Sequence, residues 1–133
     1  MRVRTIFQLS FFLSLIFIFA ITAPLFAADG YVMVGDNQTL INNGTIAGDP
    51  GDDGVTSDDD NQTIINYGTI LGDTGINFCR FDTGAAGNDT IINFGTITGT
   101  DWRAIAMGDG DDTLTNNSTG VLDGYVLMGP GDD

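Results

Sequence analysis

The sequence predicts an all-β protein: a parallel β-helix, or β-solenoid, of about four to five coils with roughly 21 to 27 residues each. Three observations lead to this prediction. One phrase, Thr followed by two mostly aliphatic residues, Asn and then Gly-Thr-Ile, recurs with its leading threonines 24, 27 and 23 residues apart. Asp, Asn, Gly and Thr, which favour turns and strands over helices, dominate the composition after the apolar N-terminal segment. No later segment sustains the 3.6-residue period of an amphipathic helix.

Residues 1–27 are expected to be a signal peptide that is removed by cleavage. Arg2 and Arg4 form a positively charged n-region, and Phe11 to Ile21 is an almost unbroken apolar core. This run is shorter than the ~20 residues that a membrane-spanning helix needs. We therefore expect a single β-solenoid domain, residues 28–133, with no membrane span after cleavage.

Inside each repeat, apolar and polar residues alternate as in a strand with one buried face. On that face each copy carries an aliphatic residue, an asparagine two positions later, and a second aliphatic residue beyond a glycine corner. One coil cannot bury its own apolar face, whereas stacked coils turn these positions into continuous columns. The three predicted columns are Leu40, Ile64, Ile91 and Leu114; Asn42, Asn66, Asn93 and Asn116; and Ile46, Ile70, Ile97 and Val121.

The asparagine column has a physical explanation. In-register asparagine side chains can hydrogen-bond along the stack, which satisfies amides that would otherwise be buried without partners. The alternative is that asparagine is simply common in turns. Its occurrence at the same offset in all four copies favours the ladder.

A third short strand is expected in each coil, built from apolar residues that recur between the repeats. These are Val32 and Val34, the segment Trp102 to Met107 with Ile105 and Met107 inward, and Val126 and Met128. Such a strand would add a further apolar column to the stack.

Two segments are expected to interrupt the pattern. Asp49 to Asp60 is rich in Asp and Gly and contains Pro50, so it should form a loop with nothing to bury. Thr74 to Gly84 is an insert that lengthens one repeat to 27 residues and carries Phe78. We expect Cys79, the single cysteine, to pack as a small apolar side chain within a strand.

The end of the chain restarts the repeat without finishing it. Gly124 to Asp133 matches the register of Ala104 to Asp112, and it stops where the next strand would begin. Nothing there resembles the polar cap that protects the terminal edge of a solenoid. We expect the 133 residues to be the N-terminal piece of a longer repeat protein, or the open edge to bind another copy end to end.

Composition narrows the classes of function. All 18 acidic residues are aspartate, the formal net charge is −14, and the chain has no His, Lys or Glu. Such a surface repels nucleic-acid phosphates, so we expect no nucleic-acid partner. His, Lys and Glu are missing as general acids or bases, and Cys79 has no base partner. Paired carboxylates could suit a glycosidase, but with so many aspartates a close pair is expected by chance, so we expect no enzymatic activity.

The segment Gly108 to Asn116, followed by another strand of the repeat, resembles the repeats of bacterial autotransporter passenger domains. This family implies an exported, right-handed parallel β-helix that is often adhesive or surface-exposed. The resemblance covers essentially all of residues 28–133. We therefore expect an exported structural or adhesive module that crosses the bacterial inner membrane and lies at the cell surface, outside the cell or in the periplasm. Its expected partner is a surface receptor or a matrix component.

The segment Met107 to Leu114 is also similar to the calcium-binding nonapeptide of RTX proteins, Gly-Gly-x-Gly-x-Asp-x-Leu-x, with Met107 in place of the first Gly. The alternative function is therefore an RTX-like calcium-binding repeat protein. Stacked carboxylates repel one another, and Ca²⁺, which prefers oxygen ligands, would remove that repulsion. Alternatively, these aspartates are solvated turn formers and no cofactor is required. The candidate calcium ligands are Asp89, Asp112 and Asp133, which would form a column, together with Asp109, Asp111 and Asp132.

Overall fold

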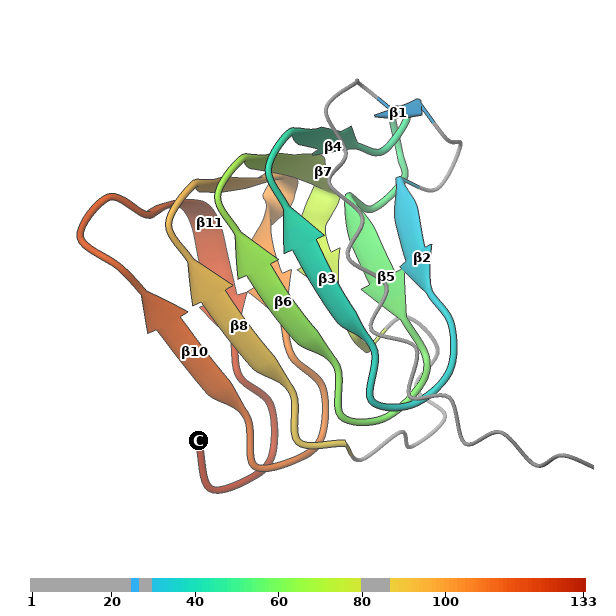
Figure 1. Cartoon of the computed structure of the whole chain (residues 1–133), viewed down its shortest axis with the longest axis vertical. Coiled ribbons are helices and arrows are strands. Elements are labelled where there is room, and N and C mark those ends of the chain that lie inside the picture. Colours follow the sequence, from blue (N-terminus) through green and yellow to red (C-terminus); the bar gives the residue numbers. More distant parts are fainter. Residues whose placement is uncertain (1–24, 27–29, 80–86) are drawn as a thin grey trace, which may run out of the picture.

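The computed structural model describes residues 25–26, 30–79 and 87–133, and the regular structure in these ranges is entirely β-strand. The strands run parallel and stack as a β-solenoid, which confirms the predicted fold class (Figure 1). A four-stranded sheet takes one strand from each of four successive coils, and a seven-stranded sheet lies against it. We number the coils one to four along the four-stranded sheet. No helix in the described ranges is long and apolar enough to cross a membrane.

The four-stranded sheet is built from the recurring phrase itself. Its strands lie in the order β10-β8-β6-β3, and the four leading threonines align with one another across the sheet. The spacing of the repeats is therefore the register of the sheet, as predicted. The strands are β3 (Thr39–Asn42), β6 (Thr63–Asn66), β8 (Thr90–Asn93) and β10 (Thr113–Asn116).

The seven-stranded sheet supplies the other two sides of each coil. In coil one these sides are two separate strands, β4 (Thr45–Ala47) and β5 (Val55–Ser57). The strand β2 (Tyr31–Met33), which precedes coil one, pairs with the edge of β5 that faces away from β7. In the later coils one long, bent strand covers both sides, and its register shifts at the bend. These long strands are β7 (Thr69–Asn77), β9 (Thr96–Ala106) and β11 (Val121–Leu127).

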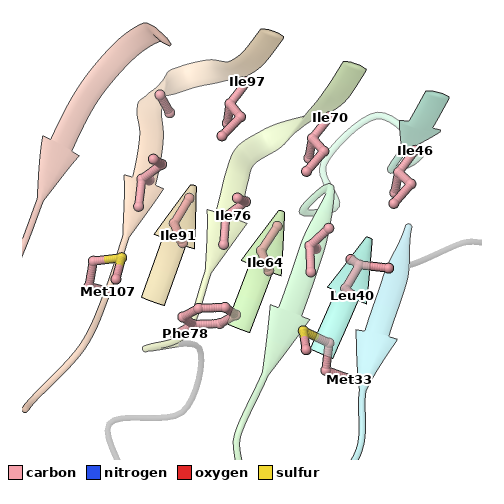
Figure 2. Close-up of a cluster of buried hydrophobic side chains, with 13 residues drawn as sticks. Met33, Leu40, Ile46, Ile64, Ile70, Ile76, Phe78, Ile91, Ile97 and Met107 are labelled. Atoms are coloured by element: carbon pink, nitrogen blue, oxygen red, sulfur yellow. The ribbon is translucent and has the colours of Figure 1, made fainter. Parts of the chain in front are cut away.

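The core consists of apolar columns that run along the stack between the two sheets (Figure 2). Each fully buried isoleucine contributes about 1.5–3 kcal/mol by leaving water. The first two columns are those predicted from the repeat, and a third follows the second side of the long strands. The buried members are Leu40, Ile64 and Ile91; Ile46, Ile70 and Ile97; and Val55, Ile76 and Ile105.

The asparagine ladder forms as predicted. Asn42 Nδ2 donates to Asn66 Oδ1 at 2.8 Å, Asn66 Nδ2 donates to Asn93 Oδ1 at 2.8 Å, and Asn93 Nδ2 donates to Asn116 Oδ1 at 2.9 Å. The first three asparagines are completely buried. Each also donates to a backbone carbonyl of the following coil, so the amides are satisfied within the stack.

The glycine of the Gly-Thr-Ile phrase is required by the approach of successive corners. A Cβ atom on Gly68 would lie 1.9 Å from the carbonyl oxygen of Gly44, and one on Gly95 would lie 2.0 Å from that of Gly68. Backbone atoms of neighbouring coils cannot move apart without breaking the adjacent sheet. Only glycine therefore fits this corner in coils two and three.

Three predicted inward positions are wrong by one residue. Leu122, not Val121, aligns with Ile97, and Val121 is 51% exposed. The reason is a turn closed by the hydrogen bond from Gly120 N–H to the Asn117 carbonyl, which lengthens this corner. Near the N-terminus Met33 is buried, whereas Val32 and Val34 on either side of it point outward.

The two segments predicted to interrupt the pattern contribute to the core instead. Asp49 to Asp60 contains β5, in which Val55 is fully buried, so it is not simply a loop. The residues Thr74 to Asn77 complete β7, and Phe78 is buried after them. Cys79 is exposed beyond the end of β7, which contradicts its predicted place within a strand. The remainder of the expected insert, residues 80–84, lies outside the described residues.

Most of the expected signal peptide also lies outside the described residues, and its cleavage stays a prediction. Within it, β1 (Leu25–Phe26) pairs in parallel with β4, opposite Ile46 and Ala47. Cleavage after residue 27 would remove this pair and leave that edge of β4 free.

Candidate functional site

A column of acidic and amide side chains lines the corner that precedes the four-stranded sheet. Its members are in register from coil to coil, and each member after Gln38 uses one side-chain oxygen to accept the backbone N–H of its equivalent in the preceding coil. The four hydrogen bonds run from Gln38 N to Gln62 Oε1 (3.2 Å), Gln62 N to Asp89 Oδ1 (2.6 Å), Asp89 N to Asp112 Oδ1 (2.7 Å) and Asp112 N to Asp133 Oδ1 (2.9 Å).

The structure thus brings Asp89, Asp112 and Asp133 into the single column proposed from the sequence. One oxygen of each carboxylate is already engaged by a backbone amide. The glutamines of the first two coils occupy equivalent places, and the oxygen of Gln62 has the same role without a charge. The column therefore holds successive corners together.

The other three candidate calcium ligands do not join this column. Asp111 and Asp132 belong to a second, exposed ladder, in which the Asp132 N–H donates to Asp111 Oδ1 at 3.0 Å and the Asp111 N–H donates to Asn88 Oδ1 at 2.9 Å. Asp109 is exposed and lines a shallow surface groove with Cys79 and Pro130. Within the described part of the chain, no group of three or more carboxylate or thiol side chains is arranged to hold a metal ion.

Burial perturbs the inner carboxylates. It raises the pKa of Asp89 to about 7; the hydrogen bond from the Gln62 N–H opposes the rise, and the charge of Asp112 adds to it. Burial also raises the pKa of Asp112, against the hydrogen bond from the Asp89 N–H. Asp112 Oδ2 is buried with no hydrogen-bond partner. Protonation of Asp89 would reduce the repulsion within this part of the column.

A second surface feature was not recognised from the sequence. Trp102, predicted to begin a short apolar strand, is 74% exposed, whereas Ile105 and Met107 are buried as expected and Ala104 and Ala106 are buried with them. It lines a groove of about 570 Å³ together with Tyr125 of the next coil. The only available signal was that Trp102 is the single tryptophan and directly follows Asp101.

Comparison of the chain with protein-family models, with curated proteins and with solved structures finds no match.

Replacing Asp89 by asparagine should stabilise the protein near neutral pH. The raised pKa means that Asp89 stabilises the fold fully only below its ordinary pKa of 3.8, and that this stability is lost as the pH rises to about 7. Asp89→Asn keeps an oxygen for the Gln62 N–H and removes the buried charge. We expect about 2 kcal/mol more stability at neutral pH, less than the full linkage value because solvent screens part of the carboxylate charge and because an amide oxygen accepts more weakly than a carboxylate. Chemical denaturation across this pH range would measure it.

Asp101→Asn removes an exposed carboxylate outside the column, so it is the control and should not reproduce this gain in stability. A stability that is indifferent to Asp89→Asn would contradict the buried, charged column.

The same measurements with millimolar Ca²⁺ or a chelator address the calcium alternative. A Ca²⁺-dependent gain that Asp112→Asn abolishes would favour a bound ion.

Proposed function

We propose that this protein is an exported structural or adhesive surface module of the autotransporter-passenger type. The observation that carries the proposal is the in-register stacking of the coils. Backbone pairing, apolar columns and the asparagine ladder all run in the same direction, along the stack.

This arrangement suits a protein that must project from a surface. Each coil contacts chiefly its neighbours, so length can be added by repetition without a new core. The outward positions of the strands take no part in the core, and their side chains can vary to contact a partner. For this module the proposed partner is a surface receptor or a matrix component. Catalysis is not part of the proposal.

The proposed location follows from the N-terminal sequence. Arg2, Arg4 and the apolar core from Phe11 to Ile21 have the features of a signal for passage through the bacterial inner membrane. The cell surface, the medium and the periplasm are all consistent with this route.

Export is tested by expressing the full chain in a bacterium and determining its N-terminus by mass spectrometry in each cell fraction. The exported protein should begin at Ala28, give or take a residue. The control is Leu15→Arg, which places a charge in the apolar core and should retain the chain, uncleaved, inside the cell. Recovery of the wild-type chain in the inner membrane with Met1 intact would contradict the proposal. Protease treatment of whole cells then distinguishes the surface from the periplasm.

The calcium-binding alternative is favoured by one observation. The buried Asp112 Oδ2 has no partner in a column that also contains Asp89 and Asp133. A cation could satisfy this oxygen, as could a proton. The stability measurements with Ca²⁺ and a chelator described above distinguish the two.

A further inference from the structure

The bend of the seven-stranded sheet is longer in coil three than in the coils on either side of it. Gly72 aligns with Gly99 and Thr74 with Arg103, so coil three has two more residues than coil two between the same points of the sheet. On the other side, Asp123 and Tyr125 of coil four align with Thr98 and Arg103, so coil four is also shorter there. The extra residues therefore protrude between two shorter neighbouring corners.

Trp102 lies in this protrusion with an unfavourable backbone conformation. Its φ is 80°, in the left-handed region that a bulky aromatic residue rarely adopts. The side chains from Thr100 to Arg103 are all exposed, so the alternation between buried and exposed positions is interrupted around Trp102. The strained backbone thus presents an indole to solvent without burying it. Strain of this kind clusters at ligand-binding sites.

A second aromatic side chain completes a groove with Trp102. Tyr125 is 71% exposed, and its partner across the sheet is Arg103, the residue after Trp102. The groove has a volume of about 570 Å³, which lies within the ~300–1,000 Å³ of small-molecule sites. Its lining consists of Gly99, Thr100, Trp102, Asp123, Gly124 and Tyr125.

Two glycines of the lining lie where the backbone is closely packed. A Cβ atom on Gly124 would lie 2.6 Å from the backbone nitrogen of Ala104, and one on Gly99 would lie 1.7 Å from the carbonyl oxygen of Arg103. Neither position therefore tolerates a side chain. The Thr100 hydroxyl donates a hydrogen bond to the Asp73 carboxylate at 3.1 Å, which fixes the position of Thr100 in the lining.

We propose that this groove binds a neutral carbohydrate. The faces of Trp102 and Tyr125 offer apolar platforms for the C–H face of a sugar ring, and the Asp123 carboxylate can accept hydrogen bonds from its hydroxyl groups. This inference rests on the proposed function, since it assigns a ligand class to the adhesive module.

The surrounding charges disfavour an anionic ligand. The net charge of −14 opposes anionic sugars and nucleic acids, and the charged residue in the lining of the groove is Asp123. A neutral sugar avoids this repulsion and can donate its hydroxyl hydrogens to the Asp123 carboxylate.

The single tryptophan makes a direct test available, because all tryptophan fluorescence comes from Trp102. The exported chain would be titrated with maltose, cellobiose, lactose and diacetylchitobiose. We expect a saturable blue shift of the emission with at least one of them. Tyr125→Ala should weaken that binding about tenfold or more, and Asp123→Asn should weaken it to a lesser degree.

The matched control is Tyr67→Ala. Tyr67 is also an exposed aromatic residue, but it stacks on Phe94 with ring centroids 4.9 Å apart and does not line the groove. It should leave the affinity unchanged, and circular dichroism confirms that each variant is folded. The inference is overturned if no sugar gives a saturable response, or if Tyr125→Ala binds as wild type does. A blue shift that grows with protein concentration alone would instead identify a contact between copies.

Failure here is distinguishable from failure of the proposed function. A chain that begins at Ala28 outside the cell and binds none of the sugars rejects only the ligand class. A chain that binds a sugar through Tyr125 and stays inside the cell rejects export and keeps the site.

Discussion

Ile70→Asp is expected to destabilise the native protein by about 4 kcal/mol or more, since it places a carboxylate without a partner in the apolar core. Ile70 is fully buried, and it lies between Ile46 and Ile97 in the second aliphatic column (Figure 2). The carboxylate would meet apolar neighbours in the coils on both sides. Urea denaturation monitored by circular dichroism would measure the loss of stability.

Ile65→Thr is the control for this substitution. Ile65 lies on the outward face of β6, opposite Ile41 and Ile92 of the neighbouring strands. Threonine retains a β-branched side chain suited to a strand, so the loss should stay below about 1 kcal/mol. Similar costs for Ile70→Asp and Ile65→Thr would mean that the two faces of the coil are not distinguished as the structure shows.

Asn66→Asp should cost about 3 kcal/mol near neutral pH. Asn66 Nδ2 donates to Asn93 Oδ1, to the Thr96 carbonyl and to the Gly68 carbonyl. A carboxylate would turn these donations into contacts between oxygens, and it would be a buried charge. Protonation of the introduced carboxyl group would restore one donor, so much of the loss should be recovered in acid. Stability measured at acid and neutral pH tests both parts.

Asn116→Asp is the matched substitution at the end of the same ladder. Asn116 is exposed, and its Oδ1 accepts from Asn93 Nδ2, a role that a carboxylate retains. Only the donation to the Gly120 carbonyl is lost. We expect a cost of about 1 kcal/mol or less. Equal costs at Asn66 and Asn116 would contradict a ladder whose energetic value depends on burial.

These substitutions also bear on the proposed surface module. An interior substitution changes contacts in two neighbouring coils at once, because each coil is packed on both sides. The groove beside Trp102 belongs to the outer surface, and Asp123 and Tyr125 are both exposed there. Changes to the groove are therefore expected to alter binding with little effect on the fold.

The repeated phrase by itself determined the architecture, the register of the four-stranded sheet and the asparagine ladder. These features depend on short stretches in which residue spacing is the same in every copy. From Thr39 to Ile46, for example, the path through one strand and one glycine corner repeats without insertion in coils two and three. In such stretches, position in the sequence is equivalent to position in the stack.

The acidic column was partly predictable for the same reason. Asp89, Asp112 and Asp133 each stand one residue before the repeat or its expected restart, so their alignment could be predicted. The hydrogen bond from the backbone N–H of the preceding coil to one oxygen of each carboxylate could not be predicted, because it depends on the distance and direction between two backbones. The raised pKa of Asp89 likewise follows from burial that only the packed corner creates.

Only the tertiary structure decided the features that lie beyond corners of variable length. Leu122 rather than Val121, Met33 rather than Val32, and the inward strand β5 all depend on how many residues a corner uses before the chain rejoins the sheet. Because side chains in a strand alternate between faces, an error of one residue exchanges the buried and exposed sets. At Trp102 the backbone itself leaves the regular conformation, and local composition cannot reveal this. The sequence therefore determined the repeating interior, while the three-dimensional packing of the irregular corners decided which side chains reach the surface.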